Sequence, residues 1–319
     1  MGRRTKRSGS SGLRLGNYFL ALNLGVVAIL GGWYAFQAET RQHEVRRLVE
    51  NAFEKEKRVS VLDVAWDIWQ LYYADNSTAK VATGDKMFVY AGAPTMHAGS
   101  AAGTLRVLTN RGYVVGYNEA LSSPAWVAYH LRDIGRLPTP KPRPDKFEVD
   151  RRTIARVGPE DYSNSGYDRG HLAPNYAIAT RFGEDAQRET FLMSNITPQL
   201  HALNAGVWKE LEMKIATNYP ARYGEVWVFA GPVFTSQSRH LRHGVRVPDE
   251  FFMIMLDEQD GKLRTLSFLI PQTAPAGVNP GDYLTTVAEI QKRTGLDFFS
   301  ELDDVSEVEV ENQRGTRVW

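Results

Sequence analysis

Apolar residues are distributed unevenly and divide the chain into a short hydrophobic segment, a charged segment and a long mixed region. Residues 18–36 (YFLALNLGVVAILGGWYAF) are nineteen consecutive uncharged positions with aromatic residues near both ends. That length is just enough for a helix across a bilayer, and aromatic side chains favour the membrane interfaces. The pattern predicts an uncleaved transmembrane helix; a cleaved secretory signal and a buried core helix are the alternatives.

The charges on either side of this segment predict its orientation. Residues 1–17 form a basic tail with five Lys or Arg and no acidic residue, whereas the fifteen residues after residue 36 contain three arginines. Because cytoplasmic flanks are enriched in basic residues, we expect a cytoplasmic tail and a C-terminal region outside the cytoplasm. The favoured location is a bacterial inner membrane with this region facing the periplasm, and a mitochondrial inner membrane is the alternative.

Residues 37–80 are predicted to form a helical stalk or linker. Acids and bases alternate through residues 38–58, which is typical of a solvated helix; a dimerising coiled coil, and therefore a homodimer, is the alternative. Residues 61–73 place Trp66, Trp69 and Tyr73 at helical spacing. We expect them to pack against a core, although a helix that binds a partner or a membrane surface has the same pattern.

The remaining chain combines strand and helix patterns without internal repeats. Residues 105–118 predict two strands joined by a turn at Asn110, Arg111 and Gly112, and residues 203–215 carry an apolar stripe at helical spacing. Further apolar runs predict buried strands at residues 225–234, 246–256 and 266–272. Residues 137–146 hold four prolines and predict an extended surface loop, and residues 305–319 predict a mobile tail.

The amino-acid composition excludes some kinds of site but does not identify the function. The 319 residues are 43% hydrophobic and 24% charged, enough to build a substantial core. The absence of cysteine excludes disulfides, thiolate metal ligands and cysteine nucleophiles. A formal net charge of +1 does not by itself favour nucleic acid, so any basic groove must come from local clustering.

The sequence YDRGHLAP at residues 167–174 places three reactive side chains close together. Asp168, Arg169 and His171 surround Gly170. A carboxylate beside an imidazole can fix its tautomer and keep it available as a proton acceptor, and a guanidinium can hold a phosphate at two points. We expect Gly170 to allow a tight backbone turn at this position.

A second group of polar residues follows 24 positions after His171. It comprises Asn195, Asn204, Trp208 and Glu212, of which the last three are spaced by four residues and share one face of the predicted helix. An amide oxygen and a carboxylate on a rigid helix, directed at a histidine, suit a hard divalent cation that keeps most of its waters.

These motifs resemble those of a known family. DRGH, NITPQ and N-x-x-x-W-x-x-x-E occur here in the order and at the distances found in the DNA/RNA non-specific endonucleases with a ββα-metal (His-Me finger) motif, which include Serratia nuclease and endonuclease G. The resemblance covers roughly residues 84–304, and we place the domain boundaries at residues 81 and 304. It implies a mixed α/β (α+β) fold around a largely antiparallel central sheet, with Mg²⁺ as cofactor and Mn²⁺ as a substitute.

The resemblance also implies a role for each motif residue. His171 would be the general base, Asn204 the direct metal ligand and Arg169 a contact to the scissile phosphate. Glu212, acting on the metal through water, and Asn195 would position the waters and the histidine.

Three arginines, Arg143, Arg151 and Arg152, are candidates for a substrate phosphate groove, with ordinary solvated charge as the alternative. Residues 240–244 (HLRHG) could be a second histidine site or a surface loop. The implied substrates are DNA and RNA, cut with little base preference. A catalytically silent, membrane-anchored protein that binds nucleic acid or docks partners on the same fold is the alternative.

Overall fold

The computed structural model describes residues 87–96, 105–259 and 262–318, and in the N-terminal region residues 25, 27–37, 42, 45 and 46. The predicted basic tail, the helix at residues 61–73 and most of the stalk therefore lie outside the described residues. Residues 27–35 are helical. No helix within the described part of the chain is long and apolar enough to cross a membrane. The predicted span includes residues 18–24 and 26, which are not described.

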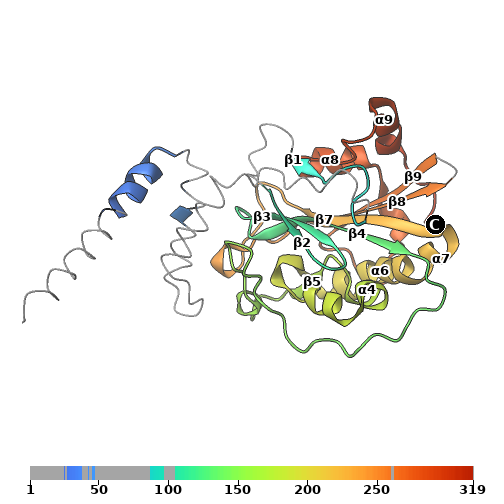
Figure 1. The fold of residues 1–319 in the computed structure, drawn as a ribbon, viewed down its shortest axis with the longest axis horizontal. Coiled ribbons are helices and arrows are strands. Elements are labelled where there is room, and N and C mark those ends of the chain that lie inside the picture. Colours follow the sequence, from blue (N-terminus) through green and yellow to red (C-terminus); the bar gives the residue numbers. More distant parts are fainter. Residues whose placement is uncertain are drawn as a thin grey trace, which may run out of the picture.

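A seven-stranded antiparallel sheet forms the centre of the domain (Figure 1). Its order is β10-β9-β8-β7-β4-β3-β2. The strands are β2 (Leu105–Thr109), β3 (Val114–Asn118), β4 (Ser123–Arg132), β7 (Glu225–Val233), β8 (Glu250–Gln259), β9 (Lys262–Pro271) and β10 (Leu284–Thr285). The central strands are apolar at almost every position because both faces of the sheet are covered. This confirms the mixed fold, and the β2–β3 hairpin confirms the predicted pair of strands at residues 105–118.

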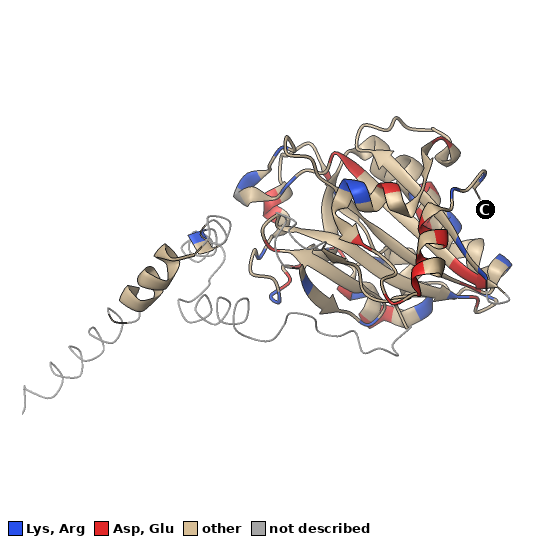
Figure 2. Ribbon diagram, turned by 90° about the horizontal axis from the view of Figure 1, so that it is seen from above, with Lys and Arg blue, Asp and Glu red and all other residues tan. Residues whose placement is uncertain are grey.

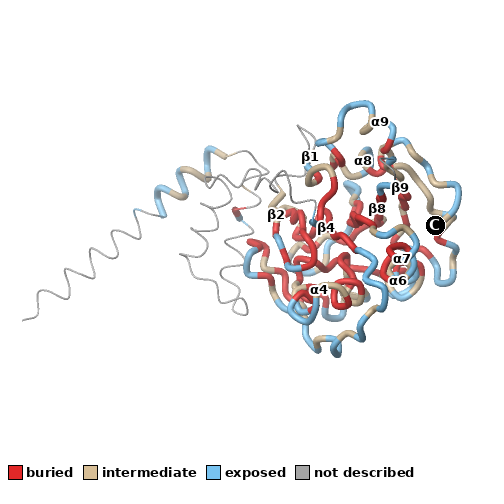
Figure 3. The backbone as a smooth tube through the Cα atoms, turned by 45° about the vertical axis from the view of Figure 1, so that its right-hand side comes forward, coloured by how far each residue is buried: buried red, intermediate tan, exposed pale blue. Residues whose placement is uncertain are grey.

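Alternate residues of the central strands face two separate hydrophobic cores. In β7, Val226 and Val228 belong to the first core, and Trp227 and Phe229 to the second. This is the two-residue period of a strand. Helices α4 (Asn175–Glu189) and α6 (Lys209–Thr217) cover the first face, and α8 (Val287–Thr294) and α9 (Asp304–Asn312) the second (Figures 1 and 3).

The C-terminal residues pack against the domain, which corrects the prediction of a tail from residue 305. Asp303 caps helix α9, and Val310 is buried in the second core. The side chain of Gln313 makes two hydrogen bonds to the backbone of β9. Its Oε1 accepts from Thr265 N at 3.0 Å, and its Nε2 donates to Leu263 O at 3.1 Å. The sequence pattern does not predict this helix, because Val305 and Val308 are exposed and only Val310 is buried against the sheet.

Short elements complete the fold. Strands β1 (Thr95–Met96) and β11 (Leu296–Asp297) pair with each other, and β5 (Asp168–His171) pairs with β6 (Ile196–Gln199) outside the large sheet. The remaining short turns and helices are η1 (Pro159–Tyr162), η2 (Met193–Asn195), α5 (His201–Leu203), η3 (Asn204–Trp208), α7 (Tyr219–Tyr223), η4 (Arg242–Gly244) and η5 (Pro280–Tyr283).

Candidate active site

The DRGH motif forms strand β5 rather than the tight turn expected from its glycine. His171 lies opposite Ile196, and Gly170 lies opposite Thr197 in β6. A Cβ atom on Gly170 would stand only 2.1 Å from the Oε1 atom of Gln199. Glycine is therefore needed here because a buried glutamine side chain crosses the strand, and not because the backbone turns.

The helical segment that follows β6 is interrupted at Asn204, the residue expected to bind metal. Residues 204–208 form a single π-helical turn between α5 and α6, with Gly206 outside the helical region at φ −100° and ψ −119°. Such turns are often found at functional sites. Trp208 donates its indole N–H to the backbone oxygen of His171 at 3.2 Å. The predicted helix is thus present, and this bond fixes it against the catalytic strand.

Asp168 bonds to the helix and not to His171, which corrects the predicted Asp168–His171 pair. Its Oδ2 accepts from the Nδ2 of Asn204 at 2.9 Å and lies 2.8 Å from the Nδ1 of His201. Residues three apart in a strand project to opposite faces, so Asp168 and His171 diverge. Since its Nδ2 is held by Asp168, Asn204 keeps its Oδ1 available for another partner.

His171 lies in an aromatic enclosure that keeps it neutral. Its ring centroid is 5.5 Å from that of Phe147 and 4.9 Å from that of Phe191. Burial, reinforced by the positive charge of Arg143, lowers the pKa of His171 to about 3. Its Nε2 is buried and has no hydrogen-bond partner among the described residues. A neutral imidazole with an unused nitrogen is suited to accept a proton.

Glu212 is the second buried group with an unused polar atom. Burial raises its pKa to about 8, against the opposing positive charges of Arg143 and Lys209. Its Oε1 has no hydrogen-bond partner within the described part of the chain. Arg143 thus acts electrostatically on both His171 and Glu212, which places the three side chains in one neighbourhood.

Asn195 braces the backbone that follows His171. It is fully buried; its Oδ1 accepts from Ala173 N at 2.8 Å, and its Nδ2 donates to Ala173 O at 3.0 Å and to Thr190 O at 2.9 Å. These contacts support a role in positioning the histidine strand. They leave its two N–H donors committed to backbone, so the contacts do not support the predicted role in positioning waters.

The candidate phosphate-binding arginines differ in the contacts that their guanidinium groups make within the protein. Arg143 stacks over the Phe191 ring at 5.1 Å, and Arg169 donates to Pro159 O while lying 5.8 Å from the centre of the Phe147 ring. Arg151 is exposed. Arg152 instead donates to both oxygens of Asp150, to Thr109 O and to Asn110 Oδ1. These bonds attach the loop to the β2–β3 turn and do not support a phosphate role for Arg152.

The donors around His171 fit a hydrated divalent cation. Asn204 offers an amide oxygen, Glu212 a buried carboxyl oxygen without a partner, and His171 an unused nitrogen. Oxygen donors and room for water are what Mg²⁺ requires. One direct protein ligand with further contacts through water is consistent with this set.

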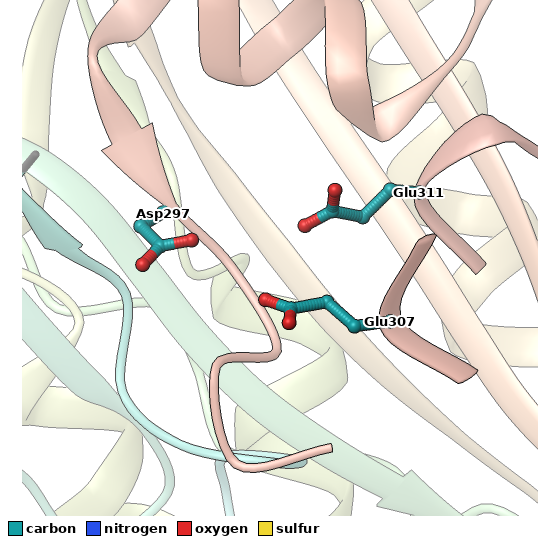
Figure 4. Close-up of side chains that lie close together, drawn as sticks. All are labelled: Asp297, Glu307 and Glu311. Carbon is teal, nitrogen blue, oxygen red and sulfur yellow. The ribbon is translucent and has the colours of Figure 1, made fainter. Parts of the chain in front are cut away.

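A separate group of acidic side chains lies on the other face of the sheet. In the described part of the chain, Asp297, Glu307 and Glu311 form the one group of three or more His, Asp or Glu side chains whose oxygens or nitrogens all lie within 4.8 Å of one another (Figure 4). Slight burial and the charges of Asp297 and Asp304 raise the pKa of Glu307. The histidine-rich segment at residues 240–244 is a surface loop, where the Nδ1 of His240 lies 3.5 Å from Gly244 O.

A comparison with protein families now identifies the chain. The family model for DNA/RNA non-specific endonucleases matches residues 91–305. The chain belongs to this family. Membership confirms the resemblance carried by the DRGH, NITPQ and N-x-x-x-W-x-x-x-E motifs, and makes the protein a nuclease that hydrolyses phosphodiester bonds.

Characterised relatives agree with this assignment. The mitochondrial nuclease EXOG of Danio rerio is 30% identical over 249 residues, which are 72% of this chain and 69% of that protein. Nuclease C1 of Cunninghamella echinulata var. echinulata is 31% identical over 228 residues, 63% of this chain and 86% of that protein. A chain in the crystal structure of the EndoG/EndoGI complex matches with a TM-score of 0.58 at 24% identity, over 63% of this chain and 89% of its own length, which shows a shared fold.

Three residues of this endonuclease site escaped the sequence analysis. Phe147 and Phe191 enclose the histidine, and His201 bonds to Asp168. The aromatic residues flank the recognised motifs by position, Phe147 at the end of the proline-rich loop and Phe191 just before NITPQ. His201 begins the helix one turn before Asn204, and that spacing was the one available signal.

Proposed function

We propose that this endonuclease is metal-dependent, cuts DNA and RNA without sequence preference and uses His171 as its general base. The observation that carries the proposal is the buried, unpartnered Nε2 of a histidine that burial holds neutral. A base must be unprotonated before it can take a proton from water, and His171 meets that condition throughout the physiological pH range.

Substrate binding changes the electrostatics of His171 in a useful direction. Burial and the charge of Arg143 both lower its pKa. A phosphate held beside Arg143 would offset the second of these causes and would by itself raise the basicity of His171.

Asn204, through its Oδ1, would hold the metal directly, and Glu212 would hold it through water. Mg²⁺ is the expected ion and Mn²⁺ the expected substitute; when bound, the ion neutralises charge on the phosphate and the leaving oxygen. Asp168 fixes the Asn204 amide by accepting from its Nδ2, so that no reorientation is required on binding.

Arg169 and Arg143 would grip the scissile phosphate from either side of the aromatic enclosure. Each is held in place over a phenylalanine ring, and Arg169 also by the Pro159 oxygen. Contacts to phosphate carry no sequence information. The same residues would therefore serve DNA and RNA substrates alike.

We further propose that residues 18–36 anchor the enzyme in a membrane with the nuclease domain outside the cytoplasm. The motivation is the length and apolarity of that segment and the excess of basic residues before it. The relatives named mitochondrial nuclease EXOG support a mitochondrial location, for which a mitochondrial inner membrane is the alternative anchor site. In either place the anchor separates a non-specific nuclease from nucleic acid in the cytoplasm.

The catalytic proposal is tested with purified protein on linear DNA and RNA of mixed sequence, with Mg²⁺, Mn²⁺ or EDTA. Cleavage of both polymers, lost with EDTA and lost in His171→Ala, is expected. Binding without cleavage by the unaltered protein would instead support the silent nucleic-acid-binding alternative, and neither binding nor cleavage would support a scaffold.

The location is tested by fractionation and by protease added to intact spheroplasts or mitoplasts. The full-length chain should remain with the membrane, its domain should be digested from outside, and deletion of residues 1–37 should release an active soluble enzyme. Digestion only after lysis would contradict the proposed orientation.

A further inference from the structure

The loop between β7 and β8 carries an unusual concentration of positive charge. Residues 234–249 contain three arginines and two histidines, Arg239, His240, Arg242, His243 and Arg246, against one acidic residue, Asp249, which accepts from Thr235 N and Ser238 Oγ within the loop. The chain as a whole is balanced, with 38 Lys and Arg against 37 Asp and Glu. Acidic and basic segments are interspersed over the domain in Figure 2. The loop is therefore a local cluster of the kind that a phosphate backbone requires.

This basic loop borders the strand that carries the catalytic residues. The Nη2 of Arg239 lies 3.3 Å from the hydroxyl of Tyr167, the residue immediately before β5. The turn η4 in the same loop contacts η1, whose Pro159 oxygen accepts from Arg169. The loop thus lies at the Asp168 end of the strand, and His171 lies at the other end.

The three arginines have different surroundings, which indicate a structural role for Arg246 and a binding role for Arg239 and Arg242. Arg246 closes the loop by donating to Thr235 O, and its guanidinium lies 5.8 Å from the centre of the Phe234 ring. Arg239 and Arg242 are exposed, and no carboxylate contact is found for either guanidinium within the described part of the chain. An exposed guanidinium without a carboxylate partner is available for a phosphate oxygen.

His201 lies beside the proposed metal ligand and not in the loop. Its side chain is 81% exposed, and its Nδ1 bonds to the same Asp168 oxygen that holds Asn204. His201 therefore belongs with the reaction centre, and Arg239 and Arg242 are the exposed cations of the loop near the start of β5.

We propose that Arg239 and Arg242 form a second phosphate-binding region, which holds the nucleic-acid strand to one side of the cleaved bond. The inference rests on the proposed nuclease function. Tyr167, which Arg239 contacts, lies four positions before His171, about 13 Å along an extended strand. The second region therefore contacts phosphates other than the one that is cleaved. The enzyme is accordingly selective for polymers over short diesters.

The test compares full-length Arg239→Ala/Arg242→Ala with a control that removes two cations at the opposite end of the sheet, Arg222→Ala/Lys262→Ala. Both control residues are exposed. Arg222 lies just before β7 and Lys262 lies at the β8–β9 turn, at the opposite end of these strands from the basic loop. Each protein is assayed for cleavage of a 30-base-pair duplex and of bis(p-nitrophenyl) phosphate, and for duplex binding in Ca²⁺ across a salt series.

The loop variant should raise the KM for the duplex about tenfold or more and leave hydrolysis of the small diester unchanged. The slope of log affinity against log salt should fall by about 1 for each lost phosphate contact, and the control should keep both values. Arg242→Ala alone should show half of the change in the slope of log affinity against log salt. Because Arg242 is exposed, this single variant tests the proposal even if the double variant folds poorly.

Three results would overturn the inference. An unchanged duplex KM and salt slope would exclude the region while leaving the nuclease proposal intact. Equal losses on duplex and small diester would show that the loop acts by supporting the reaction centre. Retained duplex binding together with lost sedimentation on phosphatidylserine vesicles would assign the loop to a membrane surface. Failure of the nuclease proposal itself has a different signature, because the unaltered protein would then cleave neither substrate.

Discussion

The two faces of the central sheet are built from the same strands but are buried in different ways. On the face covered by α8 and α9, Phe229, Phe252, Phe298 and Phe299 meet edge to face with ring centroids 5.6 to 5.7 Å apart. On the face covered by α4 and α6, the chain adds the two-stranded β5–β6 sheet, and there His171 Nε2 and Glu212 Oε1 are buried without partners in the described structure.

The difference separates stability from chemistry within one domain. An aromatic core gains free energy from burial alone, whereas a buried polar atom without a partner costs roughly 1–3 kcal/mol. We expect this cost to be kept at His171 and Glu212 because their free atoms are proposed to act on substrate and metal; the indole N–H of Trp126, on the aromatic face, is also buried without a partner in the described structure. The aromatic face should respond to mutation mainly through stability, and the β5–β6 face through activity.

The largest effect is expected at His171. Replacement by alanine should lower the rate of cleavage by roughly 10² to 10⁴, the usual contribution of a general base, with the fold and DNA binding nearly intact. Steady-state cleavage of duplex DNA and a thermal melt measure the two properties. Activity within tenfold of the unaltered enzyme would contradict the assignment.

Asn204 should come next, with a loss similar to that caused by EDTA. Asn204→Ala removes the amide oxygen proposed to hold the metal directly, while Glu212→Ala should be milder because Glu212 acts through water. A titration of Mg²⁺ against cleavage rate separates the two, since Asn204→Ala should shift the midpoint to higher Mg²⁺. Cleavage that is insensitive to EDTA would exclude the metal mechanism.

Phe298→Ala tests the opposite face. Truncating a fully buried phenylalanine should lower the free energy of unfolding by about 3–5 kcal/mol. Activity per folded molecule should be unchanged, and urea denaturation combined with a cleavage assay below the transition measures both. A selective loss of activity without loss of stability would show that the two faces are not functionally separate.

Glu212 should make the smallest and most pH-dependent contribution. Its pKa is about 8 in the folded protein and near 4.5 when unfolded, so between these values the folded state binds the extra proton. Stability of the metal-free protein should therefore fall as pH rises from 4.5 to 8, by on the order of 3 kcal/mol. Glu212→Gln should remove this slope and be the more stable protein at pH 9.

The matched control is Glu210→Gln, which removes a half-exposed carboxylate from the same helix. Urea denaturation in EDTA at pH 5 and pH 9 makes the comparison. Equal slopes for Glu212→Gln and the unaltered protein would show that the Glu212 carboxyl is solvated when the metal is absent.

The sequence by itself determined the family and the antiparallel sheet, and it predicted the candidate residues of the reaction. DRGH, NITPQ and the four-residue spacing of Asn204, Trp208 and Glu212 are local patterns, and the alternating apolar runs of the strands are read directly from the chain. These features depend on near neighbours along the sequence. Such a pattern can be recognised in the sequence without knowledge of the tertiary contacts.

Only the tertiary structure decided what each polar residue touches. Asp168 bonds to the helix and not to its sequence neighbour His171, Gly170 accommodates Gln199, and Arg152 is held by Asp150 and the β2–β3 turn. The aromatic enclosure of His171 joins Phe147 and Phe191, which lie 24 and 20 positions away along the chain. Burial and hydrogen bonding depend on residues brought together by folding, and these long-range contacts set the pKa values on which the chemistry depends.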